Sequence, residues 1–540
     1  MLTPAMKRRR RWQWTLAAGA GLALVSPAIT LLLHTGRARR ALIARLESSF
    51  GRQVSVGSFD WNILGGPRLG ANYVTVEEDP RFGAEYFLRG ERVTAGLRWK
   101  SLLSGRLEFG AIRLERHSLN VVRGPGGEWN VDSWYRPGRV PPGAGSAVAG
   151  GGGAPRVEHI RLENCRVNLK QSADKLPLAF AGVTGSLDRE SDGSWRLELE
   201  ARPMRAGVIV QDTGTIEVSG RIGGKEAARG AADLRIQWRD ASLSDALRLV
   251  REHDYGMRGR FSLELGARHE APAKTTVHPW EITAALRLHD IHRWDLAPRA
   301  GDPALNLLAA GRWWPEESRV EITRGTLEGP RSSVRVTGTA GWSGNAGQDS
   351  ALVRARVVST GIELDDGVAW LRAFRLGVSD QLRAEGNAGL DVHITGWPLR
   401  IEKGVLASDA ADIRTSRGGD TLRTGRVVVK IERARATLRP VEIFLRSETE
   451  GAIQNNAGKP GLTLRGKMEL TGPWAWELLL DGQAAQITEL LGAAKTAGWE
   501  PVPGWRADSA GRIQLKAAGA GRTGQVISPR RAKLGQAASH

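Results

Sequence analysis

Most of the chain after residue 54 alternates apolar and polar residues, which is the pattern of a β-strand with one buried face. Residues 261–265 and 282–288 are clear examples, with Phe, Ile, Leu and Ala on one face and Glu, Arg, Ser or Thr on the other. Glycines and short polar breaks separate such runs, as turns separate strands. We therefore predict a mainly β fold.

Residues 107–109, 112–114 and 119–121 alternate in this way between polar breaks and read as three consecutive strands. Residues 112–121 and 160–169 are also related to each other. Both begin Ile-Arg-Leu-Glu, and both carry an Asn between two apolar residues near the end. A repeated strand pair is the simplest explanation.

A longer repeat joins a strand to a short helix. It combines an alternating strand, a turn with residues able to cap a helix, and a short helical run, and a Gly-flanked strand follows after a variable loop. The strand and helix units lie at 234–249, 353–371 and 476–491, and the Gly-flanked strands at 259–266, 389–396 and 511–516. A spacing of about 120 residues predicts repeated modules, which stack into elongated bodies.

Residues 14–33 are uncharged and form an apolar run of about 20 residues, long enough as a helix to cross a bilayer. The basic block Lys7–Arg11 precedes it, so the positive-inside rule places the N-terminus in the cytoplasm and the chain after residue 34 on the far side. A cleavable signal peptide is the alternative, but its apolar core is usually shorter and ends in a small-x-small site. Residues 33–37, Leu-His-Thr-Gly-Arg, have no such site, which favours a retained anchor.

A short amphipathic helix is expected directly after the anchor. Ala38, Leu42, Leu46 and Phe50 recur at every fourth residue and form one stripe. Gly51 is expected to end this helix, and the period changes to that of strands at Val54.

Composition then divides the chain into five parts. Residues 1–35 hold the basic stub and anchor, 36–136 an N-terminal β domain opened by the amphipathic helix, and 137–155 a Gly/Pro-rich linker. Residues 156–519 hold the repeated β modules, and 520–540 read as a disordered basic tail.

The net charge of +19 does not identify a nucleic-acid-binding protein. Outside Lys7–Arg11 the basic residues are scattered among acidic ones, as Arg113 and Glu115 are, whereas a nucleic-acid footprint clusters them on one stripe. Cys165 is the only cysteine, which excludes an intrachain disulfide and a Cys-based zinc site.

Each predicted sheet has an apolar side that needs cover, and few long amphipathic helices follow residue 50 to supply it. The sheet must close on itself, pack on another sheet, or curl around something apolar such as a lipid tail. Periodicity does not distinguish a closed sandwich from an open groove. The candidate groove-lining residues are Phe261, Leu263, Leu265, Ile282, Leu286, Leu288, Leu390, Val392 and Ile394.

Sequence patterns for catalysis lead to no candidate active site. Residues 461–467 match a phosphate loop, but Met468 stands where the hydroxyl residue belongs. His289 and His292 lie three apart on an expected strand and point to opposite faces, which is unsuited to one metal. Gly341–Gly344 lacks the spacing of a hydrolase nucleophile elbow. We expect no enzyme activity, no cofactor and no metal.

The order of motifs over the first part of the chain resembles the N-terminal portion of AsmA family proteins, which are related in architecture to TamB and to bridge-like lipid transfer proteins. After the anchor, the motifs lie at the helix end 46–52 and at 54–59, 69–80, 82–83, 102–107, 112–121 and 126–131. The resemblance implies an inner-membrane anchor through residues 14–33 and a periplasmic, elongated, curled antiparallel β-sheet groove with a few short helices. It implies membrane phospholipid as the partner, handled between the inner and outer membranes. The alternative is an anchored scaffold that assists outer-membrane protein assembly through exposed strand edges.

Overall fold

The structure is a computed structural model. It describes residues 35–62, 66–97, 109–124, 128–131, 158–171, 174–223, 231–270, 279–299, 301–315, 317–342, 351–374, 378, 380–396, 400–414, 421–446, 461–470, 475–483, 487, 490, 512–519 and 533–535. Strands make up 68% of it, which confirms the mainly β prediction. The three described helices are short: α2 (Gly36–Phe50), α5 (Leu243–Arg251) and α6 (Leu364–Phe374).

The chain divides into two compact units. Unit 1 comprises residues 1–241, 245–253 and 268–277, and unit 2 comprises 242–244, 254–267 and 278–540. The predicted anchor at 14–33 and linker at 137–155 lie outside the described residues. In the part of the chain that the structure describes, no helix is both long and apolar enough to cross a bilayer.

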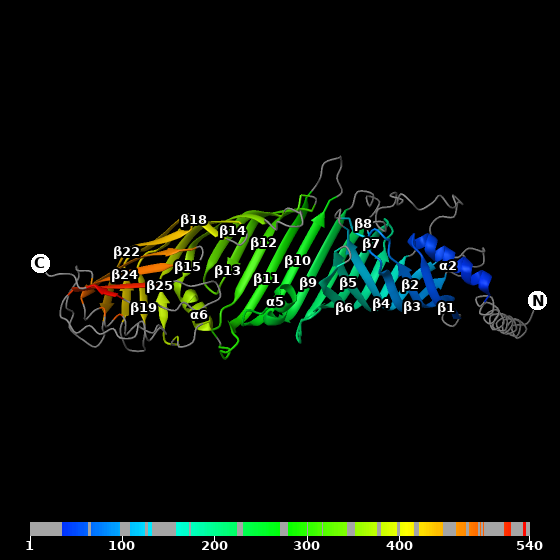
Figure 1. The fold of residues 1–540 in the computed structure, drawn as a ribbon, viewed down its shortest axis with the longest axis horizontal. Helices are drawn as coiled ribbons and strands as arrows, with labels where there is room; N and C mark the ends of the chain where they lie inside the picture. The colour runs from blue at the N-terminus through cyan, green and yellow to red at the C-terminus, as the bar shows by residue number, and fades with distance from the viewer. Residues whose placement is uncertain are drawn as a thin grey trace, which may run out of the picture. The chain divides into compact units, whose positions relative to one another are not determined.

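Unit 1 is a curled sheet of nine strands in chain order (Figure 1). These are β1 (Val54–Asn62), β2 (Arg68–Glu77), β3 (Tyr86–Leu97), β4 (Phe109–Arg123), β5 (His159–Gln171), β6 (Asp174–Arg189), β7 (Ser194–Arg205), β8 (Thr215–Gly223) and β9 (Ala232–Ser242). Each strand pairs antiparallel with the next, except that β4 and β5 are parallel. The expectation of an antiparallel sheet is therefore wrong at this pair.

The three short strands predicted within 107–121 are also wrong, because β4 runs unbroken from Phe109 to Arg123. Its polar break is a local irregularity at Arg116, which has a φ of 51°. Asn164 in β5 has the same φ of 51°, so both copies of the repeated motif are distorted at the same position. Ile112 lies opposite Ile160, and residues 111–115 and 118–123 each face their counterparts in β5 on both sides of the distortion.

Helix α2 supplies cover for the first strands of unit 1. Thr35 caps it, with its Oγ1 3.4 Å from Ala38 N, and Gly51 ends it in the left-handed conformation with a φ of 64°. Leu42, Ile43 and Leu46 pack against the apolar residues of β1, β2 and β3. Ala38 is half-buried, in keeping with the predicted stripe.

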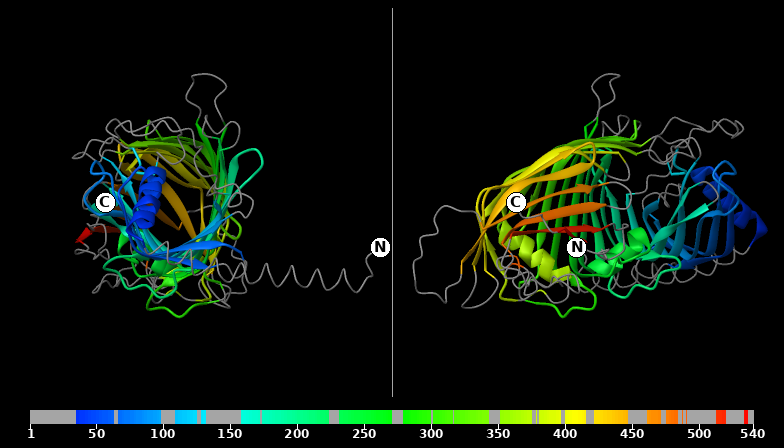
Figure 2. Two further views of the ribbon diagram at one scale, coloured as in Figure 1. Left: turned by 90° about the vertical axis from the view of Figure 1, so that its right-hand side faces the viewer. Right: turned by 60° about the vertical axis from the view of Figure 1, so that its left-hand side comes forward.

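The described strands form one large curled sheet that is not closed (Figure 2), and unit 2 holds the strands of this sheet from β10 onward. Its main strands are β10 (Met257–His269), β11 (Trp280–Arg293), β12 (Leu305–Trp314), β13 (Arg319–Glu328), β14 (Ser333–Trp342), β15 (Ala351–Glu363), β17 (Asn387–Thr395), β18 (Arg400–Ser408), β21 (Val427–Glu432), β22 (Arg435–Arg446), β23 (Leu462–Glu469), β24 (Trp476–Gln483), β25 (Arg512–Gly519) and β26 (Lys533–Gly535). From β11 onward these strands pair antiparallel in the order given.

Three short strands, β16 (Arg383–Glu385), β19 (Ala411–Arg414) and β20 (Thr421–Thr424), extend this sheet by pairing with one another and with β22. Gly386 separates β16 from β17. Its φ is 137°, a conformation that glycine adopts readily and that strains other residues. Strand β26 lies within the segment 520–540 that was predicted to be a disordered tail.

The strand and helix repeat predicted from the sequence is present. Strand β9 leads directly into α5, and β15 leads directly into α6. In the third copy, β24 is followed by Ile487 and Leu490, which are helical. The Gly-flanked strands of the second and third copies, β17 and β25, pair with β15 and β24.

Candidate functional site

The nine predicted lining residues lie on one face of the unit 2 sheet. On β11, Leu286 shares its face with Ile282 and Leu288 by alternation, and it lies opposite Leu307 of β12. The same row continues from Leu307 to Leu327 and from Leu327 to Val334.

Val336 lies two residues beyond Val334 on β14 and therefore shares its face. Val336 lies opposite Val357, and Val357 lies opposite Val392 of β17. Leu390 and Ile394 flank Val392 at a distance of two residues and therefore share its face.

Strand β10 joins the same face through its contact with β11. A Cβ added to Gly266 would lie 2.5 Å from Thr283 Oγ1, so these two residues face the same side. Phe261, Leu263 and Leu265 alternate with Gly266, and Ile282 alternates with Thr283. Both sets therefore face the opposite, apolar side.

The other face of the unit 2 sheet is polar and carries cross-strand ion pairs. Arg356 Nε and Nη2 lie 3.0 Å and 2.8 Å from the two carboxylate oxygens of Asp391. Lys467 Nζ lies 2.9 Å from Glu477 Oε2. Leu308 is an apolar residue on this polar face. It is 49% exposed, whereas its neighbour Leu307 on the apolar face is half-buried, so the polar face is the more exposed one at this position.

The apolar face differs between the two units in how well it is covered. Under α2, the core residues of β1 to β3 are between 0% and 7% exposed. Among the nine lining residues of unit 2 only Val392 is buried, at 5%, and the other eight are half-buried. Among the described helices, α6 packs on β11, β15 and β16, and none packs on β12, β13 or β14 as α2 packs on β1. The described residues therefore cover the broad apolar face of unit 2 only in part.

The apolar face is filled by side chains near β22 to β24. Val441, Ile443, Leu462 and Leu480 are buried together with Ile487, which is 0% exposed. Ile487 follows β24 in the third repeat. The partly exposed region is therefore concentrated on β10 to β18.

Helix α6 covers one margin of the unit 2 sheet and is fixed by a carboxylate. Asp366 Oδ2 accepts hydrogen bonds from Arg331 N at 3.1 Å and Ser332 Oγ at 2.6 Å. In unit 1, Asp245 Oδ2 of α5 accepts from Gln211 N and Asp212 N at 3.0 Å and 2.8 Å. Each Asp is the third residue of its helix, so the repeat preserves this attachment.

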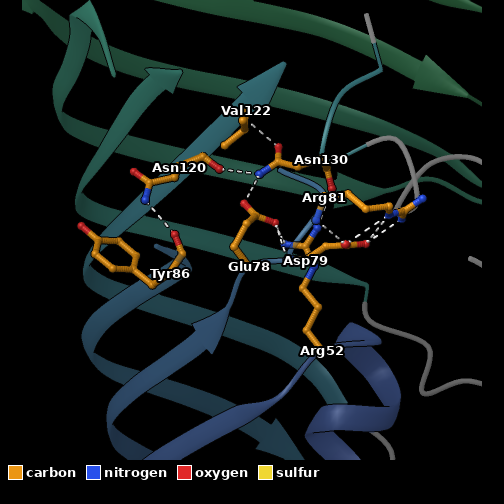
Figure 3. A network of polar contacts seen from close by, with 8 residues as sticks. All are labelled: Arg52, Glu78, Asp79, Arg81, Tyr86, Asn120, Val122 and Asn130. Carbon is orange, nitrogen blue, oxygen red and sulfur yellow. Dashed lines mark hydrogen bonds and ion pairs between the residues drawn. The ribbon is translucent and has the colours of Figure 1, made fainter. Parts of the chain in front are cut away.

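Unit 1 contains a buried polar network that the sequence did not reveal (Figure 3). Arg52 Nη1 lies 3.0 Å from Glu78 Oε1, and the two side chains are 8% and 3% exposed. Asn130 Nδ2 donates to Glu78 Oε2 at 2.6 Å, and the Asn130 carbonyl accepts from Arg52 Nη2 at 2.7 Å. The network ties the end of α2 to the β2–β3 loop and to the segment after β4.

Burial dominates the electrostatics of this pair. It lowers the pKa of Arg52, and the charge of Glu78 opposes that change. It raises the pKa of Glu78, and Arg52 and the Asn130 hydrogen bond oppose that change. Each charge is therefore tolerated in the interior because the other is beside it.

His117 is buried on the apolar side of β4 without a hydrogen-bond partner at either ring nitrogen. Its ring packs on Gly90, where an added Cβ would lie 2.2 Å from Cγ. Burial lowers the pKa of His117 to about 4. The ring is therefore neutral at pH 7. The sequence contained one signal of this buried histidine. His117 is a polar residue at an apolar position of the repeated motif, where the second copy has Cys165.

The candidate patterns for chemistry do not assemble into a site. His289 Nδ1 lies 2.8 Å from Asp290 Oδ2, and His292 Nδ1 lies 2.7 Å from the Asp290 carbonyl oxygen, both at the end of β11. Among the described residues no group of three His, Cys, Asp or Glu side chains is placed to hold a metal ion. Residues 462–469 form strand β23, and the next described element is strand β24, whereas a phosphate loop leads into a helix.

No family model, curated protein or solved structure matches this chain. The apolar face of unit 2 and its surroundings are therefore the features that bear on function.

Proposed function

We propose that the protein handles phospholipid, with acyl chains resting on the apolar face of unit 2. The observation that carries the proposal is that the apolar face of unit 2 is less completely covered than the apolar residues under α2. Eight apolar residues of β1 to β3 under α2 are between 0% and 7% exposed, with Leu69 and Val93 beside them half-buried, whereas eight of the nine lining residues of unit 2 are half-buried. Apolar surface of this extent is costly in water, at about 25 cal/mol per Å². An acyl chain removes that cost without needing directional contacts.

The curled, open form of the sheet supports the proposal because it offers an apolar side to an elongated ligand and leaves the charged side to water. We further propose that the sheet forms a groove, that residues 14–33 anchor the chain in an inner membrane, and that the rest is periplasmic. The motif order that resembles AsmA family proteins supports this setting. A role between two membranes follows from that resemblance.

The scaffold alternative has less support because α2 protects the free edge of β1. Glu77 N donates to Gln53 O, so the peptide groups of Val54 and Val56 point away from β2. Arg39 Nη2 donates to the Val56 carbonyl at 2.6 Å, and Glu47 Oε1 accepts from Val54 N at 3.3 Å. The edge that a client strand would join is already occupied there by side chains.

Two neighbouring residues provide a matched test of the proposal. Leu307 lies on the apolar face and Leu308 on the polar face of the same strand. Titration of the purified chain with a phospholipid that carries a fluorescent acyl chain should show weaker binding for Leu307→Asp than for the native protein, and unchanged binding for Leu308→Asp. Equal binding by all three proteins, with both variants folded, would refute binding at this face.

A further inference from the structure

Tryptophan side chains mark one margin of the apolar face in unit 2. Trp280 begins β11 and lies opposite Trp313 near the end of β12, with ring centroids 6.1 Å apart. Trp314 follows on the opposite, polar face, where the Arg319 guanidinium lies 3.9 Å from the centre of its ring. All three indoles are half-buried. We call Trp280 and Trp313, which share the apolar face with Ile282 and Leu307, the tryptophan margin.

The opposite end of the same strands is different. The C-terminal carbonyl of α6, at Phe374, accepts a hydrogen bond of 3.1 Å from Arg293, the last residue of β11. Helix α6 packs against β11, β15 and β16. One margin is therefore occupied by a helix that Asp366 fixes in place, whereas the tryptophan margin is formed by the strands themselves.

Between the two margins the face is apolar. Ile282, Leu286 and Leu288 of β11 face the same side as Leu305 and Leu307 of β12. Six residue intervals of strand cover about 20 Å. One leaflet of a bilayer has a hydrocarbon depth of about 15 Å, half the thickness of the core. The apolar band is long enough for one layer of lipid tails laid along the strands.

Indole groups favour the boundary between apolar and polar surroundings, because the ring is apolar and its N–H needs a polar partner. A phospholipid has that same boundary at its glycerol. We infer that phospholipid lies along the strands of unit 2 in one direction, with its headgroup and glycerol at the tryptophan margin and its tail ends toward Leu288 and α6. This inference rests on the proposed function and specifies the orientation of the ligand.

The orientation can be tested with two photoreactive phospholipids that differ only in the position of a diazirine, in the headgroup of one and at the acyl terminus of the other. Each is bound to the purified full chain in detergent and irradiated, and the labelled peptides are identified by mass spectrometry. The headgroup probe should label the tryptophan margin. The acyl-terminus probe should label the region of Leu288, Leu305 and Leu327.

A variant pair controls for the role of the indoles. Trp280→Ala with Trp313→Ala should lose the preference of the headgroup probe for this margin while still being labelled by the acyl probe. Trp294→Ala should keep both patterns, because Trp294 lies on a turn beyond β11 and is 64% exposed.

The outcomes separate the orientation from the proposed function. Reversed labelling, or equal labelling of both margins by both probes, would overturn the orientation while showing that lipid binds the face. Labelling that avoids the apolar face altogether would overturn the proposed function itself.

Discussion

Asn168 Nδ2 lies 3.0 Å from Asn120 Oδ1, and the two residues occupy the same position in two copies of one motif. The parallel pairing of β4 and β5 stacks the copies in register, so that identical side chains become neighbours. Asn168 also donates to Ser118 Oγ at 3.0 Å, and Asn120 Nδ2 donates to the Tyr86 carbonyl at 2.7 Å. The repeat thus builds a polar ladder that joins β3, β4 and β5.

Asn120 should be the more important member of the ladder, because it is 1% exposed and Asn168 is half-buried. Asn120→Ala removes the side-chain donor to the Tyr86 carbonyl and one of the two acceptors of the Asn168 amide, which costs about 1 to 3 kcal/mol of unfolding free energy. Asn168→Ala should cost less, because water can reach the groups that it leaves. Urea unfolding of both variants measures the difference, and an equal loss in the two would contradict this account.

The ion pair between Arg52 and Glu78 and the ladder illustrate what the sequence could not show. Arg52 and Glu78 are 26 positions apart, and neither falls in a pattern that marks a buried charge. Their burial depends on how the β2–β3 loop and the segment after β4 pack on the sheet. The Asn repeat at 120 and 168 was visible, but the direction of pairing that brings the two together is not encoded in local periodicity.

Acid should destabilise the protein through His117. Its pKa in the folded protein is about 4, below the ordinary value of 6.5, so the unfolded chain binds the proton more readily. Stability is then fully present above pH 6.5 and is lost as the pH falls toward 4, by up to about 3 kcal/mol.

The His117→Leu variant isolates this contribution, because its unfolding free energy should lack that part of the pH dependence. Chemical unfolding of native and variant proteins at a series of pH values from 7 to 4 gives the difference between them. A difference that stays constant over this range would show that His117 does not titrate as its burial requires.

The packing of the His117 ring on Gly90 should make that glycine intolerant of a methyl group. An added Cβ would lie 2.2 Å from His117 Cγ, so Gly90→Ala forces the buried ring to move. Overpacking of this kind costs about 1 to 3 kcal/mol. Gly96→Ala in the same strand is the control, because its nearest neighbour would be 3.7 Å away. Thermal unfolding should show a lower Tm for Gly90→Ala than for Gly96→Ala, and the opposite order would disprove the contact.

Loss of the α2 side chains that cover β1 should expose a strand edge. The double variant Arg39→Ala with Glu47→Ala removes the partners of the Val56 carbonyl and the Val54 N–H. Unpaired strand edges promote association with other chains. Light scattering should show a larger associated fraction than for Arg40→Ala, whose side chain bonds only within the helix, to Gly36 O. No increase in association would indicate that α2 does not protect this edge.

The alternation of apolar and polar residues was sufficient to assign the nine lining residues to one side, because side-chain direction in a strand is set locally. The same rule failed at 107–121, where the polar break around Arg116 was interpreted as a boundary between strands. A single distorted residue absorbs that break and lets β4 continue. The extent of cover over the apolar face is a tertiary property, and no local pattern distinguishes the face under α2 from the open one.

The lipid content of the protein itself tests whether acyl chains occupy the apolar face of unit 2. The full chain is extracted from membranes, exchanged extensively into fresh detergent, and analysed by quantitative mass spectrometry beside a single-helix membrane protein of similar size. Phospholipid should be retained in excess over that control, and in a reduced amount in Leu307→Asp. A stably folded protein that carries no more lipid than the control would contradict this expectation.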